Sequence, residues 1–365
     1  MSLTDREQQI VALLRRDPLL GSEAIAAALG TTRAAVNVHL SNLGKKGVIL
    51  GRGYVLADQR HVVVVGGANM DVKARSTRAA VTATSNPGTA SMSAGGVGRN
   101  VAENLARLGT RTHLVAAVGA DPLGDQLLAA TSDAGVHVQH VRRSARATGT
   151  YTAVLDADGE LVVAVADMAA TDELAPADLD GARDLVAVAG LLVLDGNLAP
   201  TTLAYALDLA AEAGVPTILE PVSVPKAAAL AHLLGEDRPL LAVTPNRDEL
   251  GALTGRPVGT DREIDDAVAV LHGRGVQHVW VRLGERGSVL SSAQGRTELA
   301  TVPTEVVDVT GAGDAMLGAF AHALLAGEEA AAAAAFGHAA AALTVASPHT
   351  VRPDLTDRLV RRTAR

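Results

Sequence analysis

The residues best suited to chemistry lie together in the segment Thr310-Gly311-Ala312-Gly313-Asp314, between two apolar runs. Its glycines predict a tight turn that opens a helix, and the first backbone N–H groups of a helix have no partner within it. Such a helix start attracts an anion, and Asp314 adds a base beside the anion hole of Gly311, Ala312 and Gly313. Transfer of a phosphoryl group to an alcohol needs both parts, because the moving group must be stabilised and the hydroxyl must lose its proton. On its own, the segment is equally compatible with an ordinary helix start that carries an N-terminal Asp.

Two further polar motifs stand near glycines in the first part of the same region. Asn69 and Asp71 follow His61–Val65, a β-branched run typical of a strand that is buried on both faces. At the carboxyl end of such a strand, an amide and a carboxylate can bind vicinal hydroxyls. The glycines of Gly95-Gly96 let the backbone approach a ligand, and Asn100 adds a polar contact. Each motif taken singly could also be a plain turn between a strand and a helix.

The composition favours a folded protein with a large core. The chain has 365 residues, of which 48% are hydrophobic and 20% charged, and it contains no cysteine. The lack of cysteine excludes disulfides, thiolate metal sites and a thiol nucleophile. No apolar run reaches the length of a membrane span without charges or glycines, and the N-terminus lacks a signal-peptide pattern. We therefore expect a cytoplasmic protein with no membrane partner.

Residues 1–57 read as a domain of their own. Short helices are predicted to begin near Thr4, Ser22 and Thr32, and a hairpin is predicted over Val48–Leu56. Three short helices followed by a hairpin resemble a winged helix-turn-helix. An alternative interpretation is a small helical module that touches only protein.

The third helix of this domain could contact DNA. Residues 1–60 hold eight basic and five acidic side chains, a net charge of +3, which leaves −11 for the rest of a chain whose net charge is −8. The excess of positive charge is small, so it favours DNA as a partner only weakly. The side chains expected to reach phosphates and base edges are Arg33, Asn37, Ser41 and Lys45, with Arg52 at the hairpin tip.

Residues 61–365 predict an α/β domain. Short apolar strands such as Leu191–Leu194 and Val276–Val281 alternate with helices, which is typical of a mostly parallel sheet flanked by helices. Val72–Met92 and Gly149–Val165 break this rhythm and predict antiparallel strands. We expect these strands to form a small β lid. Strands of this kind can also pair between subunits, which favours a homodimer.

Taken in chain order, four motifs together resemble the ribokinase-like (PfkB) carbohydrate and nucleoside kinases. These motifs are Asn69 with Asp71, Gly95-Gly96 with Asn100, Asn246-x-x-Glu249, and Gly311-Ala312-Gly313-Asp314. The resemblance extends from residue 61 nearly to the C-terminus. It implies a ribokinase-like fold, ATP and Mg²⁺ as cofactors, and K⁺ as an additional cation.

The resemblance also assigns roles to individual residues. Asp314 would be the catalytic base, and the amides of Gly311, Ala312 and Gly313 would form the anion hole. The residues expected to bind the sugar are Asn69, Asp71, Gly95, Gly96 and Asn100. Asp167 would approach the sugar or base from the lid, although an exposed carboxylate at a strand end is nearly as good an interpretation.

The nucleotide side of the site follows from the same resemblance. Asn246 and Glu249 would support the Mg²⁺ and phosphate network. Asp308 and Thr310 match positions that help to bind a monovalent cation. The remaining ATP-binding candidates are Arg282, which departs from the usual Thr or Ser, Gly284, and His338, which replaces a frequent Asn.

Within the family, several segments are more similar to pseudouridine kinases than to ribokinases. They are residues 85–88, 95–105, 150–155, 163–168 and 221–223. Val97 stands where ribokinases usually carry Lys, which counts against free ribose as the substrate. The expected reaction is ATP-dependent phosphorylation of the 5′-hydroxyl of a ribonucleoside, with pseudouridine as the first candidate. Two alternatives stay open, namely another sugar or nucleoside substrate, and a transcriptional regulator that senses such a ligand through a kinase fold.

Overall fold

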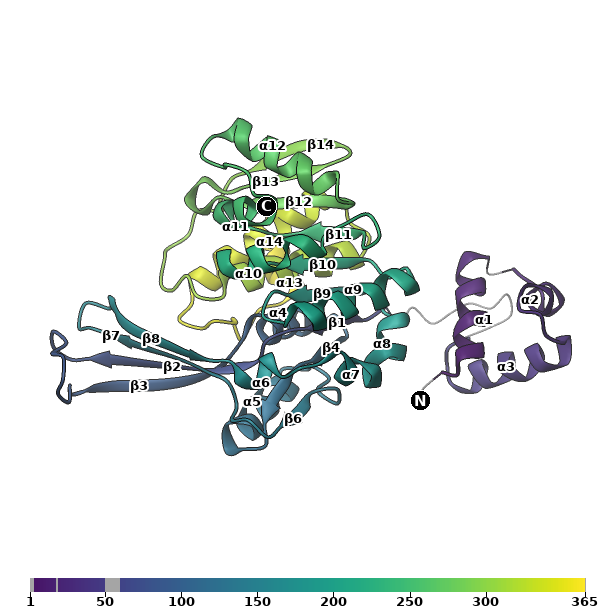
Figure 1. Ribbon diagram of the computed structural model, residues 1–365, viewed down its shortest axis with the longest axis horizontal. Helices are drawn as coiled ribbons and strands as arrows, with labels where there is room; N and C mark the ends of the chain where they lie inside the picture. The colour runs from purple at the N-terminus through teal and green to yellow at the C-terminus, as the bar shows by residue number, and fades with distance from the viewer. Residues whose placement is uncertain (1–2, 18, 50–59, 365) are drawn as a thin grey trace. The chain divides into compact units, whose positions relative to one another are not determined.

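The computed structural model describes residues 3–17, 19–49 and 60–364. Its contacts divide the chain after Arg60 into two units, which are described separately (Figure 1). The first unit contains α1 (Asp5–Arg16), α2 (Ser22–Ala28) and α3 (Arg33–Lys45). These helices begin where the sequence predicts. The expected hairpin over residues 48–56, with Arg52, falls largely on residues 50–59, which lie outside the described residues.

Short polar side chains set the starts of α1 and α3. Thr4 and Glu7 form a reciprocal capping box on α1, and the hydroxyl of Thr32 accepts from the Ala35 amide at the start of α3. Glu7 also forms an ion pair of 2.6 Å with Lys46, just beyond α3, so the same carboxylate links the two helices. The apolar faces of the three helices pack on one another through Ile10, Leu14, Ile25, Val36 and Leu43.

The second unit is built on an eight-stranded sheet in the order β14-β13-β12-β11-β10-β9-β1-β4. The strands from β12 to β4 in this order pair in parallel, and β13 and β14 form an antiparallel edge that the sequence did not reveal. The bounds are β1 Val62–Val65, β4 Thr112–Val115, β9 Leu191–Asp195, β10 Thr217–Glu220, β11 Leu240–Val243, β12 Val276–Arg282, β13 Ser288–Ser292 and β14 Gly295–Leu299. A short parallel pair, β5 (Ala117–Gly119) and β6 (Arg142–Ser144), lies outside this sheet.

Helices cover both faces of the sheet. Alternate residues of β1 show this directly, because Val63 and Val65 belong to one core and Val62 and Val64 to the other. The first core takes side chains from α7 Pro176–Leu179, α8 Arg183–Ala187, α9 Pro200–Ala213, α10 Val224–Leu230, α11 Arg247–Thr254 and α12 Asp261–His272. The second takes them from α4 Val97–Arg107, α5 Pro122–Asp133, α13 Ala312–Leu325, α14 Ala330–Val345 and α15 Asp357–Thr363. A single turn, α6 (Ala169–Asp172), follows the last lid strand.

A separate four-stranded sheet forms the predicted lid and projects away from the main sheet (Figure 1). It consists of β2 (Asn69–Ser76), β3 (Gly88–Gly95), β7 (Thr150–Leu155) and β8 (Leu161–Asp167), in the order β3-β2-β7-β8. The hairpins β2–β3 and β7–β8 are antiparallel, as expected, and β2 joins them by pairing in parallel with β7. Within the described part of the chain, no helix combines the length and apolarity needed to cross a membrane.

Candidate active site

The helix α13 begins at a glycine turn, as the sequence predicts. Its N-cap residue, Gly311, has a φ of 79°, and a Cβ there would overlap the carbonyl oxygen of Thr350, so only glycine fits. No N-cap side chain satisfies the first amides of the helix. Among the described residues, the amides of Gly311 and Gly313 have no hydrogen-bond partner, whereas the Ala312 amide donates to the Val309 carbonyl at 3.3 Å. Two of the three expected amides are therefore available to an anion.

Asp314, the third residue of α13, contacts another helix. Its Oδ2 accepts a hydrogen bond of 2.9 Å from Nδ2 of Asn100 on α4. Asn100 is oriented in turn by Arg99, whose Nη1 donates to the Asn100 Oδ1 at 3.1 Å. This second bond occupies the acceptor end of the Asn100 amide and leaves its donor end facing Asp314.

The electrostatic surroundings of Asp314 suit a base that works near neutral pH. Burial raises the pKa of Asp314 to about 7. The hydrogen bond from Asn100 and the charge of Arg282 oppose the rise, and the carboxylates of Glu220 and Asp195 add to it. General bases are most effective when their pKa lies near the working pH.

The structure brings the expected sugar-binding residues together at the base of the lid. Nδ2 of Asn69 donates to Oδ1 of Asp71 at 2.7 Å, and Asn69 is paired with Gly95 across β2 and β3. A Cβ on Gly95 would overlap the Asp71 carboxylate, and Gly96, with a φ of 96°, lies against the carbonyl of Gly67. Burial raises the pKa of the Asp71 carboxyl. Both glycines are therefore needed for close packing at this point.

Asp167 ends β8 opposite Thr150. Its backbone lies near Gly149, which also adjoins the Asn69 side chain, so this strand end borders the residues that we expect to bind the sugar. The carboxylate is exposed and accepts a hydrogen bond from the amide of Ala169 at 3.1 Å. The structure thus places Asp167 beside the site with its side chain bound to the turn that follows it.

Asn246 and Glu249 cap the start of α11. The Asn246 Oδ1 accepts from the Glu249 amide at 2.9 Å, and the Glu249 Oε2 accepts from the Asn246 amide at 2.8 Å. This reciprocal arrangement is a capping box, which satisfies two amides of the helix with its own side chains. Burial raises the pKa of Glu249, and the neighbouring Glu220 adds to the rise.

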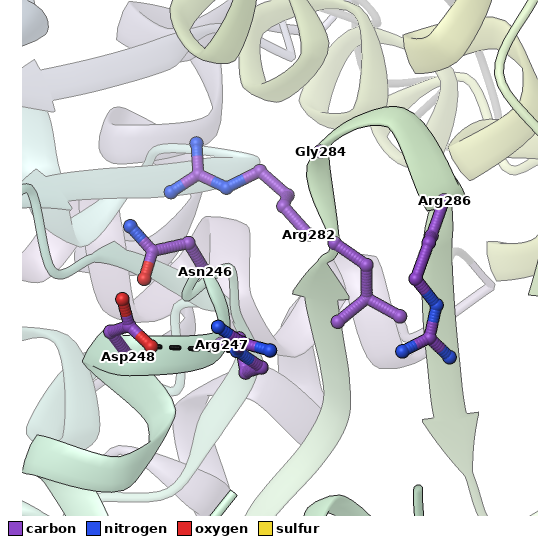
Figure 2. Close-up of a pocket in the computed structure, with 7 residues that line it drawn as sticks. Asn246, Arg247, Asp248, Arg282, Gly284 and Arg286 are labelled. Atoms are coloured by element: carbon purple, nitrogen blue, oxygen red, sulfur yellow. Dashed lines mark ion pairs between the residues drawn. The ribbon is translucent and has the colours of Figure 1, made fainter. Parts of the chain in front are cut away.

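Arg282, at the end of β12, connects the two helix starts. Figure 2 shows its side chain reaching towards Asn246 along the hollow that both residues line. One guanidinium nitrogen, Nη2, lies 2.6 Å from Glu220 and 3.5 Å from Glu249. The other, Nη1, lies 2.7 Å from where a Cβ of Gly313 would stand. A positive charge is therefore held directly beside the amides at the start of α13.

A cavity of about 670 Å³ extends from this point between the end of β12, residues 301–309 and the helices α13 and α14. Three residues that we expected at the ATP site, Arg282, Gly284 and His338, line it together with Gly313. Further lining comes from Val302, Pro303, Val306, Val309, Met316 and Val345. An apolar cavity that ends at bare amides and an arginine is suited to a molecule with a flat apolar base and a phosphate chain.

His338 lines this cavity and is bound to Ser288. Nε1 of Trp280 donates to the Ser288 hydroxyl at 2.8 Å, and that hydroxyl lies 2.6 Å from Nε2 of His338. Because a tryptophan N–H can only donate, Ser288 accepts from Trp280, and its hydroxyl bridges the indole and the imidazole. Burial also lowers the pKa of His338. The imidazole is therefore neutral at physiological pH.

The expected monovalent-cation residues have a cationic partner from the protein itself. Nζ of Lys73, on lid strand β2, lies 2.9 Å from Oδ2 of Asp308 and 3.4 Å from Oγ1 of Thr310. The position next to these oxygens is filled by an ammonium group, so the side chains do not fit a bound K⁺ in this conformation.

Sequence reasoning missed two carboxylates of this site. Asp195 ends β9 and accepts from the amides of Gly67 and Asn197, and Glu220 ends β10 and binds Arg282. Both are buried and both raise the pKa of Asp314. The rule that open α/β sheets bind ligands at the carboxyl ends of their strands could have identified them.

Comparison with known proteins identifies the class of this fold and site. Residues 59–357 match the pfkB family of carbohydrate kinases, and residues 3–49 match the winged helix-turn-helix DNA-binding family. The chain is 37% identical over 356 residues to the uncharacterized sugar kinase YeiI of Escherichia coli (strain K12), covering 97% of each protein. It is 32% identical over 303 residues to the pseudouridine kinase of the same organism, covering 82% of this chain and 95% of the relative.

Solved structures agree with these matches. The ribokinase of Arabidopsis thaliana in complex with ribose and ATP has a TM-score of 0.72 and 28% identity, covering 84% of this chain and 98% of the ribokinase. The structure of "a putative sugar kinase from Clostridium perfringens" has a TM-score of 0.75 and 27% identity, covering 84% of this chain and 96% of that chain. The chain belongs to the PfkB family of carbohydrate kinases, with a winged helix-turn-helix segment at its N-terminus. It is therefore an ATP-dependent phosphotransferase of the sugar and nucleoside kinase class.

Proposed function

We propose that this protein transfers the γ-phosphoryl group of ATP to the 5′-hydroxyl of a ribonucleoside, and that pseudouridine is its substrate. The observation that carries the chemistry is Asp314, held by Asn100 beside the free amides of Gly311 and Gly313. The choice of pseudouridine is supported by the similarity to the pseudouridine kinase of Escherichia coli. The match covers 95% of the length of that relative.

In this proposal the sugar lies between the main sheet and the lid. Asn69, Asp71, Gly96 and Asn100 hold its hydroxyls, and Asp167 approaches from the strand end of the lid. Asp314 accepts the proton of the 5′-hydroxyl as that oxygen attacks the phosphoryl group in line. The amides at the start of α13 stabilise the charge on the equatorial phosphoryl oxygens.

Arg282 and the strand-end carboxylates complete the phosphate side. The Arg282 guanidinium, which already lies over Gly313, contacts the phosphate chain, and His338 borders the adenine. Bound with ATP, Mg²⁺ would supply positive charge to the phosphate oxygens. Glu249 and Glu220 would hold it, because these two buried carboxylates share the single guanidinium of Arg282, and Mg²⁺ prefers carboxylate and phosphate oxygens.

A substrate panel tests the proposal. Purified protein is incubated with MgATP and, separately, with pseudouridine, uridine, ribose and fructose, and the products are identified by mass and by phosphorus NMR. We expect a monophosphate of pseudouridine, esterified at the 5′-oxygen, to form faster than any other product. Faster phosphorylation of a free sugar would favour the alternative in which the protein is a kinase of the same family that acts on a different substrate.

A second function, DNA binding by the first unit, is favoured by the family match of residues 3–49. Arg33, Asn37, Ser41 and Lys45 follow one another at intervals of four residues on α3 and are all exposed, so they share one face. We propose that this face contacts DNA, and that the kinase unit senses or modifies the ligand that controls binding. A gel shift with DNA from upstream of the gene should exceed that with random DNA, and equal shifts would leave only a docking role.

We also propose that the lid strands pair two subunits in a homodimer. The outer strand β8 exposes Leu161, Val163 and Val165, more apolar surface than a free lid strand needs. Light scattering should give twice the mass of the chain, and a monomer at all concentrations would exclude this pairing.

A further inference from the structure

Lys73 places a positive charge at a loop that leads directly into the start of α13. It lies on lid strand β2, opposite Ser91 of β3 and Ala153 of β7. Its ammonium contacts Asp308 and Thr310, which are more than two hundred residues away along the chain. A side chain of the lid thus reaches the residues immediately before Gly311.

Asp308 is the residue that shapes this loop. Its Oδ1 accepts from the Thr310 amide at 2.8 Å, while its Oδ2 accepts from Lys73. The amides of Val307 and Asp308 donate to the carbonyl of Val345, at the end of α14. Because only Val309 and Thr310 separate Asp308 from Gly311, we expect the order of this loop to fix the position of the free amides of α13.

The charge of Asp308 needs a partner. Burial alone would raise the pKa of this carboxyl, but the hydrogen bonds from Lys73 and Thr310 outweigh burial and lower the pKa. The side chains of Lys73 and Asp308 are 38% and 29% exposed, so water screens the pair only in part. The carboxylate is thus paired with a cation that water screens only in part.

The identity of the cation is informative in this particular chain. Of its 32 basic residues only four are lysines, so arginine is the usual basic residue here. Lysine carries a compact, strongly hydrated point charge, whereas the guanidinium of arginine is a broad planar fork. Among the cationic side-chain groups, the compact ammonium of lysine is therefore the one most similar to a monovalent metal ion.

We propose that the Lys73 ammonium takes the place of the monovalent cation at the Asp308–Thr310 loop, so that this kinase needs no K⁺, and that it links the lid to the anion hole. Lys73 is then a positioning residue that acts through Asp308 and the loop. The proposal rests on the proposed function for its effect on catalysis, but its ion-binding part stands without a substrate.

The experiment compares the wild type with Lys73→Met, which keeps the unbranched apolar stem of the side chain and removes its charge. Melting temperature and calorimetric binding are measured with KCl, NaCl and choline chloride at equal ionic strength. We expect the wild type to bind no K⁺ and to melt at the same temperature in all three salts. Lys73→Met should melt about 2–4 °C lower in choline or Na⁺, the size of a loss of about 1 kcal/mol, and K⁺ should bind and restore it.

Lys226→Met is the matched control, because Lys226 is another partly buried lysine, which donates to Asn197 near Asp195 and does not contact the Asp308–Thr310 loop. We expect no K⁺ response from this variant. Once a substrate is known, Lys73→Met should lose about 10- to 100-fold in kcat without K⁺, the cost of a slightly misplaced catalytic group, and regain it with K⁺.

Two results would overturn the proposal. One is K⁺ binding or K⁺-dependent stability in the wild type, which can be measured even if Lys73→Met does not fold. The other is a folded Lys73→Met variant that binds no K⁺ and whose melting temperature does not change with K⁺. If no nucleoside is phosphorylated but K⁺ binds only to Lys73→Met, the proposed function fails and the cation replacement stands.

Discussion

The helices α11 and α13 both begin at the edge of the candidate site, and both carry a carboxylate as their third residue. In α11, Glu249 folds back on the Asn246 amide and closes a capping box. In α13, the corresponding residue, Asp314, contacts Asn100 on another helix, and Gly311 offers no side chain to the amides. A helix start whose amides are hydrogen-bonded by side chains of the same helix is a rigid support. A helix start whose amides have no partner can bind an anion.

The largest effect is expected from Asp314→Asn, which tests whether the carboxylate at the start of α13 is the base. The substitution keeps the shape of the side chain but removes the proton acceptor, so we expect kcat to fall by about two to four orders of magnitude. The KM should change little, because the groups that bind the substrate remain. Steady-state kinetics with the phosphorylated product as the readout checks this, and retention of most activity would exclude Asp314 as the base.

The glycine at the start of α13 can be compared with the glycine beyond its end. Gly311 and Gly327 have φ values of 79° and 89°, but only Gly311 has a neighbour that a Cβ would strike. We expect Gly327→Ala to lower the free energy of unfolding by about 1 kcal/mol and to leave activity intact. Gly311→Ala should lower it by clearly more and abolish phosphoryl transfer, as denaturant unfolding and activity will show. Equal losses in both variants would mean that the turn at Gly311 is not specially constrained.

At α11, two substitutions of Glu249 separate the cap from the charge. Glutamine can close a capping box as glutamate does, so Glu249→Gln should keep the free energy of unfolding, while Glu249→Ala should lower it by about 1 kcal/mol. Both should reduce kcat/KM by about tenfold if the carboxylate supports the metal and phosphate network. Wild-type activity in Glu249→Gln would instead restrict Glu249 to its structural role.

The smallest effect concerns α3, whose start is capped by Thr32 and followed at once by the exposed Arg33. Arg33→Ala should reduce the slope of log affinity against log salt by about 1, the value for one phosphate contact. Arg15→Ala, an exposed arginine on α1, serves as the control. If both variants leave the slope unchanged, α3 does not face DNA phosphates.

Much of the fold could be predicted because its signals are local. Runs such as Val62–Val65 mark buried parallel strands, and the glycine turn before Asp314 marks the start of a helix. The antiparallel lid strands also follow from their own residues. The edge strands β13 and β14 were missed because Ser288–Ser292 is mostly serine and Gly295–Leu299 is mostly polar and exposed, so neither forms a long apolar run.

The contacts within the candidate site could not be predicted, because they join distant parts of the chain. The partners Asn100 and Asp314 are 214 residues apart, and Lys73 and Asp308 are 235 apart. Arg282 was recognised as a departure from the Thr or Ser that is usual in the family, but only the fold brings it next to Gly313. The capping box at α11 is a local pattern, and its sequence spacing could have predicted it.

The pH dependence of kcat/KM tests the central claim most directly, because it reports the ionisation of the free enzyme's base. Burial raises the pKa of Asp314 to about 7, so the carboxyl is protonated and inactive at lower pH. The account predicts that kcat/KM of the wild type rises with pH in proportion to the ionised fraction and levels off above about 7, while the residual activity of Asp314→Asn lacks this step. A wild-type profile that is flat across neutral pH, or a step that survives in Asp314→Asn, would contradict it.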